Sequence, residues 1–128
     1  MKIKQKNPDT AICAIDYAFR RLGGKYKGRI LLHLHWTGRL RYGELRRTIP
    51  EITTKMLTQT LRELEEDELI ERTAYKELPP RVEYALTPMG AQLVPFIILL
   101  RDWGTGQMIK EKIPVLGLDD CILPENNP

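Results

Sequence analysis

Two short helical patterns lie only three residues apart in the middle of this chain. Apolar residues recur at helical spacing from Tyr42 to Thr48 and again from Thr53 to Glu66. Only Pro50-Glu51-Ile52 separates the two patterns, and Thr53 is a residue type that caps helix N-termini. Two short helices joined by such an abrupt turn have the geometry of a helix-turn-helix pair.

Regular patterns also flank this pair on both sides. Residues 11–22 and 26–36 place apolar side chains at helical spacing, and Gly23-Gly24 provides a stop between them. After the pair, residues 69–75 and 82–86 alternate and are rich in Ile, Thr, Val and Tyr. This alternation, with a proline-containing loop between the two segments, predicts a β-hairpin.

The last regular element should be another helix. Thr87 suits the N-cap, Pro88 suits the first helical turn, and the apolar period continues toward Trp103-Gly104. The complete order of elements is that of a winged helix-turn-helix, a mainly α fold with a small β-hairpin wing. We expect a single such domain with flanking dimerisation helices over residues 1–113, followed by an irregular tail over residues 114–128.

Length and composition narrow the class of protein. A chain of 128 residues can bury one core but not two. Its longest apolar run, Phe96 to Leu100, is far too short to span a bilayer, and no leader opens the sequence. The cysteines lack metal-ligand spacing, and no catalytic triad or phosphate-binding loop is found. We therefore expect a cytoplasmic protein that is not an enzyme and holds no metal or cofactor.

The charges are sorted along the sequence. From Arg20 to Arg62 there are eleven Lys or Arg residues but only Glu44 and Glu51 as acids, whereas six acidic residues fall between Glu63 and Glu71. Solvated faces usually mix the two signs. A basic segment around a helix-turn-helix predicts contact with the phosphates of double-stranded DNA, which supply most sequence-independent affinity. The acidic run would then begin where the second helix leaves the groove.

Several motifs together resemble the HxlR family of winged helix-turn-helix transcription regulators, relatives of the MarR type. They are Cys13, GGKY at 23–26, RYGELRR at 41–47, ITTKMLTQTLRELEEDELIER at 52–72, PPRVEYALTPMG at 79–90 and WG at 103–104. The resemblance implies a homodimer that binds a pseudo-palindromic operator. Glu68 departs from the family pattern, which has Gly in this turn, and a left-handed backbone there would cost roughly 1 kcal/mol.

The helix over residues 53–66 is the candidate recognition helix. Leu57, Leu61 and Leu64 should face the core, which leaves the opposite face for DNA. Gln can pair with adenine, Arg or Lys with guanine, and Thr can reach a phosphate or a thymine methyl group. The candidate residues are Thr53, Thr54, Lys55, Thr58, Gln59 and Arg62. The alternative is an ordinary solvated face, and the sequence does not separate base contacts from phosphate contacts.

Arginines outside this helix are further candidates for DNA contact. Arg46 and Arg47 end the first helix of the pair, where one of them should contact the phosphate backbone of the DNA. Arg81 follows two prolines at the expected wing tip and would suit a narrow minor groove. A phosphate contact or simple solvation fits the position of Arg81 equally well.

Cys13 is the candidate sensor residue. Some HxlR relatives use a cysteine at this position to sense oxidants or electrophiles, often through a disulfide across the dimer, and the resemblance extends this role to Cys13. The alternative is packing within a buried apolar stripe. Cys121 in the tail is a weaker partner, and the identity of any effector stays open.

The flanking helices carry the expected dimer surface. Helices over residues 11–22 and 88–103 have more apolar surface than a compact winged helix needs, and such a patch marks an interface. The residues concerned are Ile12, Ile15, Phe19, Leu93, Phe96, Ile97, Leu100 and Trp103. The alternative function is a winged-helix module that binds another protein and no DNA, which would not require the basic segment.

Overall fold

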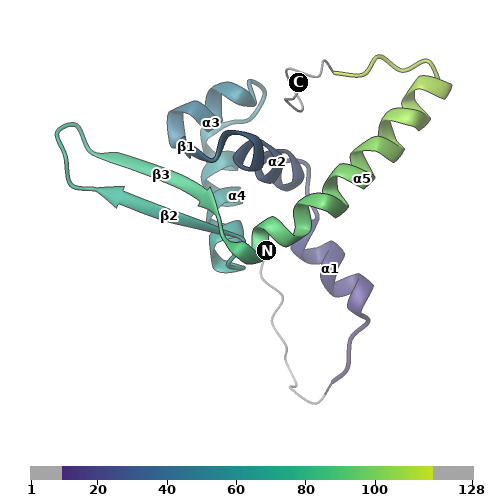
Figure 1. Cartoon of the computed structure of the whole chain (residues 1–128), viewed down its shortest axis with the longest axis horizontal. Coiled ribbons are helices and arrows are strands. Elements are labelled where there is room, and N and C mark those ends of the chain that lie inside the picture. Colours follow the sequence, from purple (N-terminus) through teal and green to yellow (C-terminus); the bar gives the residue numbers. More distant parts are fainter. Residues whose placement is uncertain (1–9, 117–128) are drawn as a thin grey trace.

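The protein, represented by a computed structural model, is described for residues 10–116, so Cys121 and most of the predicted tail lie outside the described residues. None of the helices in this range is long and apolar enough to cross a lipid bilayer. The elements, in chain order, are α1 (Ala14–Leu22), α2 (Lys27–Thr37), β1 (Arg39–Arg41), α3 (Tyr42–Thr48), α4 (Thr54–Glu66), β2 (Ile70–Tyr75), β3 (Arg81–Leu86) and α5 (Pro88–Lys110). This order confirms the mainly α winged helix-turn-helix expected from the sequence (Figure 1).

The wing is a three-stranded antiparallel sheet in the order β1-β3-β2 rather than a hairpin alone. The sequence did not reveal β1, because the strand has only three residues and two of them are arginines. Its single apolar residue, Leu40, pairs with Tyr84 across the strands, and both side chains are buried. The third strand therefore ties the wing to the connection between α2 and α3.

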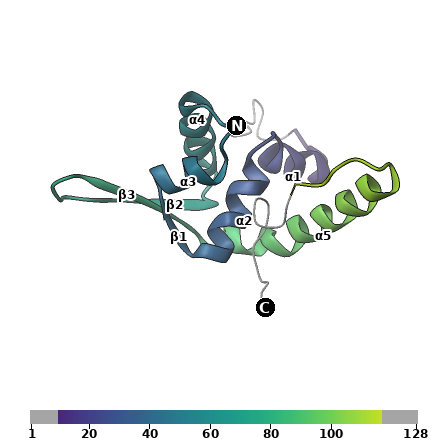
Figure 2. The same ribbon diagram turned by 90° about the horizontal axis from the view of Figure 1, so that it is seen from above.

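Helix α2 lies at the centre of the fold. It packs against α5, β3, α3 and β1, and Figure 2 shows it between the α3–α4 pair and α5. Its side chains are buried on nearly every face, although five of its eleven residues are Lys, Arg, His or Thr. The buried members are Lys27, Ile30, Leu31, Leu32, His33 and Leu34.

The helix-turn-helix pair forms where it was predicted. Helix α3 has the expected bounds, and Thr53 is the N-cap of α4, as predicted. The Thr53 hydroxyl oxygen accepts a hydrogen bond from the Met56 amide at 3.1 Å. Ile49 and Ile52 anchor the turn, since both are almost completely buried. The turn therefore fixes the angle between α3 and α4 through apolar packing.

The flanking helices differ from the prediction in extent and in packing. Helix α1 begins at Ala14 rather than at residue 11, and α5 continues past Trp103-Gly104 to Lys110. The prediction that Ile97 and Leu93 belong to an exposed dimer surface was wrong, because both pack against the core of the single chain. Ile97 is only 5% exposed within the core, and Leu93 is half-buried against it. Both residues lie on the side of α5 that faces the domain, so its opposite side carries the exposed residues.

Glu68 occupies the left-handed conformation expected for this turn, with φ of 63°. The Glu68 amide donates to the Glu65 carbonyl at 2.9 Å, and the Leu69 amide donates to the Leu64 carbonyl at 3.0 Å. These two bonds form a Schellman motif, which normally takes Gly at the left-handed position. The motif ends α4 and turns the chain into β2, despite a backbone cost of roughly 1 kcal/mol at Glu68.

The start of α5 is held against the start of the wing. The Thr87 hydroxyl caps α5 by accepting from the Gly90 amide at 3.0 Å, and it also donates to the Glu68 carbonyl at 2.6 Å. Gly90 sits so close to β2 that a Cβ atom there would lie 2.0 Å from the Leu69 carbonyl oxygen. Only Gly fits at this crossing, so α4, the wing and α5 meet at one packed junction.

Candidate nucleic-acid interface

Helix α4 presents one apolar face and one polar face. Leu57, Leu61 and Leu64 are at most 2% exposed, which confirms the face predicted to pack in the core. The opposite side of the helix and its cap are exposed, and they carry the six residues predicted as candidate DNA contacts. These residues are Thr53, Thr54, Lys55, Thr58, Gln59 and Arg62.

Tyr42 connects the first helix of the pair to this face, a role that the sequence analysis missed. Its hydroxyl donates to the Thr54 carbonyl at 3.2 Å and lies 2.9 Å from the Thr58 hydroxyl. Arg46 and Arg47 are exposed on α3 and line an open hollow of about 380 Å³ together with Thr54. The hydroxyl-bearing start of α4 and the end of α3 therefore form one continuous surface.

A buried lysine supports the middle of α4. The Lys27 ammonium, on a side chain only 5% exposed, lies 3.1 Å from a carboxylate oxygen of Glu63. The other Glu63 oxygen accepts a hydrogen bond from the Gln59 amide nitrogen at 3.0 Å. The hydrogen bond from Gln59, together with the interactions of Lys27, lowers the pKa of Glu63. Gln59 is thus oriented by a polar link between α2 and α4.

Four of the eleven cations of the basic segment form ion pairs, three of them with the acidic run, so part of the charge sorting serves the fold. Lys27 pairs with Glu63, while Arg21 lies 3.8 Å from the buried Asp67. Arg39 reaches Glu71, and Arg29 pairs with Glu51. These cations connect elements of the fold through their ion pairs. Within residues 10–116, the members of the basic segment that make no ion pair are Arg20, Lys25, Arg41, Arg46, Arg47, Lys55 and Arg62.

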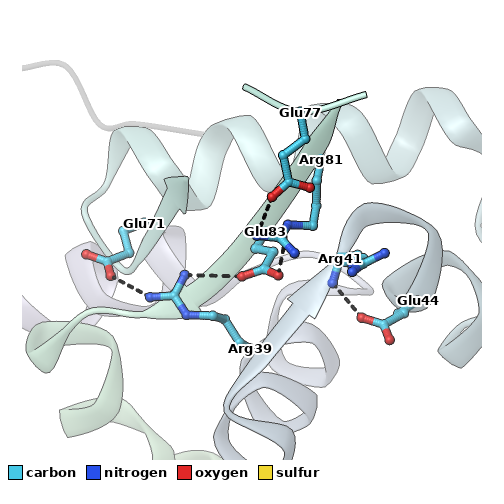
Figure 3. A network of polar contacts seen from close by, with 7 residues as sticks. All are labelled: Arg39, Arg41, Glu44, Glu71, Glu77, Arg81 and Glu83. Atoms are coloured by element: carbon cyan, nitrogen blue, oxygen red, sulfur yellow. Dashed lines mark hydrogen bonds and ion pairs between the residues drawn. The ribbon is translucent and has the colours of Figure 1, made fainter. Parts of the chain in front are cut away.

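Arg81 does not project freely from the wing tip. It begins β3, and its guanidinium lies 3.2 Å from Glu77 and 3.5 Å from Glu83 (Figure 3). The guanidinium carbon also lies 3.9 Å from the centre of the Tyr75 ring. The prolines precede Arg81 as predicted, but the register of the hairpin turns its side chain toward these acidic and aromatic neighbours.

Cys13 is exposed at the N-cap of α1, so the predicted alternative of a buried packing role is wrong for the single chain. It lines a hollow of about 270 Å³ that also includes Asp16, Tyr17 and Arg20. No group of three or more His, Cys, Asp or Glu residues in the described range is arranged to hold a metal ion.

Most of the large exposed apolar residues lie on or beside α1 and α5, although Met56 on α4 and Leu78 in the wing loop are also exposed. Every residue of α1 except Arg21 and Leu22 is exposed. The C-terminal half of α5 extends away from the core (Figure 1). Six of the residues predicted for the dimer surface are exposed, between 47% and 66%. They are Ile12, Ile15, Phe19, Phe96, Leu100 and Trp103.

A helix-turn-helix pair with an exposed second helix, combined with a three-stranded sheet whose β2–β3 hairpin follows the pair, is the architecture of the winged helix-turn-helix class of transcriptional regulators. Residues 21–112 match the family model described as HxlR-like helix-turn-helix. The chain belongs to this family, as the motifs at 41–47 and 79–90 predicted. It is a transcriptional regulator of the helix-turn-helix type.

Named relatives and a solved structure agree with this placement. An uncharacterized HTH-type transcriptional regulator of Methanothermobacter thermautotrophicus is 47% identical over 96 residues, which cover 75% of this chain and 72% of the relative. The uncharacterized regulator YdeP of Bacillus subtilis is 42% identical and covers 89% and 87% of the two chains. The redox regulator HypR in its oxidized form is 40% identical, with a TM-score of 0.69 over 73% of this chain and 96% of that one.

The link between Lys27 and Glu63 generates a prediction about stability and pH. Glu63→Gln should lower the free energy of unfolding at pH 7 by about 1–3 kcal/mol, because it leaves a nearly buried ammonium without a carboxylate. The lowered pKa of Glu63 means that its contribution is complete above the usual carboxyl pKa near 4.5 and is lost as the pH falls further. Urea unfolding at pH 7 and pH 3 should therefore show a smaller difference between wild type and variant at pH 3.

Glu65→Gln provides the control, since this exposed carboxylate lies on the same helix and forms no ion pair with a described residue. It should change stability little at either pH. An equal loss of stability for Glu63→Gln at both pH values would contradict the assigned role of the carboxylate charge.

Proposed function

We propose that this regulator binds double-stranded DNA as a homodimer, with α4 of each subunit in the major groove of one half-site of a pseudo-palindromic operator. The observation that carries this proposal is the two-sided character of α4. Its leucines fill the core, while its opposite face offers hydroxyl, amide and guanidinium groups that suit base edges and phosphates. The proposal assigns binding and no catalysis, without a cofactor, and places the protein in the cytoplasm.

The proposed interface extends beyond α4. Arg46 and Arg47, exposed beside Thr54, are suited to the phosphate backbone on one flank of the helix. The wing would lie along the neighbouring minor groove, where Arg81 reaches DNA only after leaving its acidic partners. The alternative function, a winged-helix module that binds protein alone, does not account for the uncommitted cations on α3 and α4.

The first functional prediction concerns α4. Gln59→Ala and Arg62→Ala should each weaken operator binding by about 1–3 kcal/mol if the residue reads a base, with a much smaller effect on random duplex DNA. The operator is obtained by selection from random duplexes with the purified protein, and affinity is measured by fluorescence anisotropy. Lys110→Ala, which removes a cation from the far end of α5, should leave operator affinity unchanged. Unchanged affinity in both α4 variants would remove this face from the interface.

The exposed apolar surface of α1 and α5 supports the proposed homodimer. Phe96, Leu100 and Trp103 lie on the side of α5 that turns away from the core, and α1 adds Ile15 and Phe19. Large apolar side chains grouped in this way are normally covered by a partner. A two-fold axis through this surface would place two copies of α4 about one DNA turn apart.

Sedimentation equilibrium tests the dimer directly. The wild-type chain should have the mass of a dimer at micromolar concentration. Trp103→Glu should weaken association by more than about tenfold, because burying an unpaired carboxylate costs more than about 1.4 kcal/mol. Gln92→Glu introduces the same charge at an exposed polar position of α5 and should leave the dimer intact. A monomeric wild type would exclude this assembly.

We also propose that Cys13 responds to oxidants. Two observations support this role: Cys13 is exposed beside the proposed dimer surface, and the similar protein HypR is described as a redox regulator. Oxidation would join two Cys13 sulfurs across the dimer, with the two thiols losing two protons and two electrons to the oxidant. Such a bond requires Cα atoms within roughly 7 Å of each other, so it would shift the spacing of the paired recognition helices.

A mild thiol oxidant should therefore change the operator affinity of the wild type and produce a dimer band on a non-reducing gel. Both effects should disappear in Cys13→Ser and persist in Cys121→Ser, because only the first removes the proposed sulfur. Equal operator affinity of oxidised and reduced wild type would show that Cys13 has no sensing role.

A further inference from the structure

The outer face of the wing carries a chain of alternating charges across its three strands. Arg39 lies 3.7 Å from both Glu71 and Glu83, and Arg81 continues the chain from Glu83 to Glu77 (Figure 3). The antiparallel register places these residues on one face, since alternate residues of paired strands share a side. Within this chain of ion pairs, two guanidinium groups face three carboxylates.

Arg41 lies beside this chain but does not join it. Its backbone amide donates to Glu44 at 2.8 Å, whereas its exposed side chain makes no ion pair with any described residue (Figure 3). Arg39 and Arg41 occupy the same face of β1, two positions apart. Arg39 is therefore held in ion pairs within the wing, whereas Arg41 forms no ion pair with a described residue.

Arg41, Arg81 and Glu77 line one open hollow between the wing and the start of α3. The hollow has a volume of about 440 Å³, and Gly43 and Pro79 form part of its wall. Tyr42 borders this hollow and also the neighbouring one that holds Arg46, Arg47 and Thr54. A line of basic groups therefore leads from the wing across α3 to the first turn of α4.

We propose that this hollow holds one phosphate of the DNA backbone, bound by Arg41 and by Arg81 after Arg81 exchanges Glu77 for the phosphate. The inference rests on the proposed function and adds Arg41 to its contacts. A phosphodiester fits because guanidinium groups bind phosphate oxygens in a paired geometry and because a DNA strand can follow the line of basic groups.

The contacts of Arg81 suit such an exchange. Glu77 is half exposed, so its carboxylate is readily hydrated once Arg81 leaves. The Arg81 Nε atom is buried and lacks a hydrogen bond, although it lies 3.5 Å from Glu83. Glu83 would keep the side chain close to the hollow while Glu77 gives way. Glu77 and Glu83 thereby limit the attraction of the wing for anions in the absence of DNA.

The matched pair Arg41→Gln and Arg39→Gln tests the phosphate site. Both variants remove one positive charge from the same face of β1, but only Arg41 lines the hollow. Affinity for a random-sequence duplex is measured by fluorescence anisotropy across a potassium chloride series. Arg41→Gln should weaken binding uniformly and reduce the slope of log affinity against log salt by about 0.9 for each subunit on the DNA. Arg39→Gln should leave the slope unchanged.

A variant that frees Arg81 from Glu77 should raise the affinity for DNA, the opposite of the effect of Arg41→Gln. Glu77→Gln should tighten random-duplex binding and steepen the salt dependence relative to Glu111→Gln, which removes an equal charge at the far end of α5. Equal slopes for wild type and Arg41→Gln, or equal losses for Arg41→Gln and Arg39→Gln, would overturn the phosphate site while leaving DNA binding intact. If the wild type itself fails to bind duplex DNA, the proposed function and the phosphate site are both wrong.

Discussion

The burial of α2 is the constraint on which the other elements depend. Ile30, Leu31 and Leu34 are essentially inaccessible to solvent, and they are covered from different sides by α3, α5 and the sheet. Because a close-packed interior resists small displacements, the elements around α2 keep fixed relative positions. The polar face of α4, the wing and the outer side of α5 thus belong to one body. The Lys27–Glu63 ion pair adds a polar connection from the start of α2 to the face of α4.

Local patterns in the sequence were sufficient to predict most of the fold and the side of α4 that faces the core. The leucine spacing of α4 determines which of its sides is buried, so the exposed candidates followed from the sequence alone. By contrast, β1 is stabilised by pairing with β3, more than forty residues away, and its own composition gives little sign of a strand. Ile97 continues the apolar pattern of α5, but its contact with the core depends on how α5 crosses α2.

The ion pairs of each arginine could not be predicted from the sequence for a similar reason. Arg39 and Arg41 are neighbours of the same type on the same face of one strand, yet only Arg39 meets Glu71 and Glu83. Strand register alone does not give this difference, because Arg41 is the direct cross-strand partner of Glu83, so it arises from the directions of the side chains. Exposed ion pairs of this kind contribute little to stability. Their greater effect is on the attraction of each arginine for anions, since a guanidinium paired with a carboxylate attracts an approaching anion less than a solvated guanidinium does.

The close crossing at Gly90 has a mechanical consequence. With no space between the first turn of α5 and the Leu69 carbonyl, α5 cannot slide or tilt at this point without moving the start of the wing and the end of α4. The far half of α5 then acts as an arm fixed at the junction of Glu68, Leu69, Thr87 and Gly90. In the proposed dimer, a small rotation between the two subunits at the outer end of this arm would displace the two proposed recognition helices relative to each other, with no internal rearrangement of either subunit.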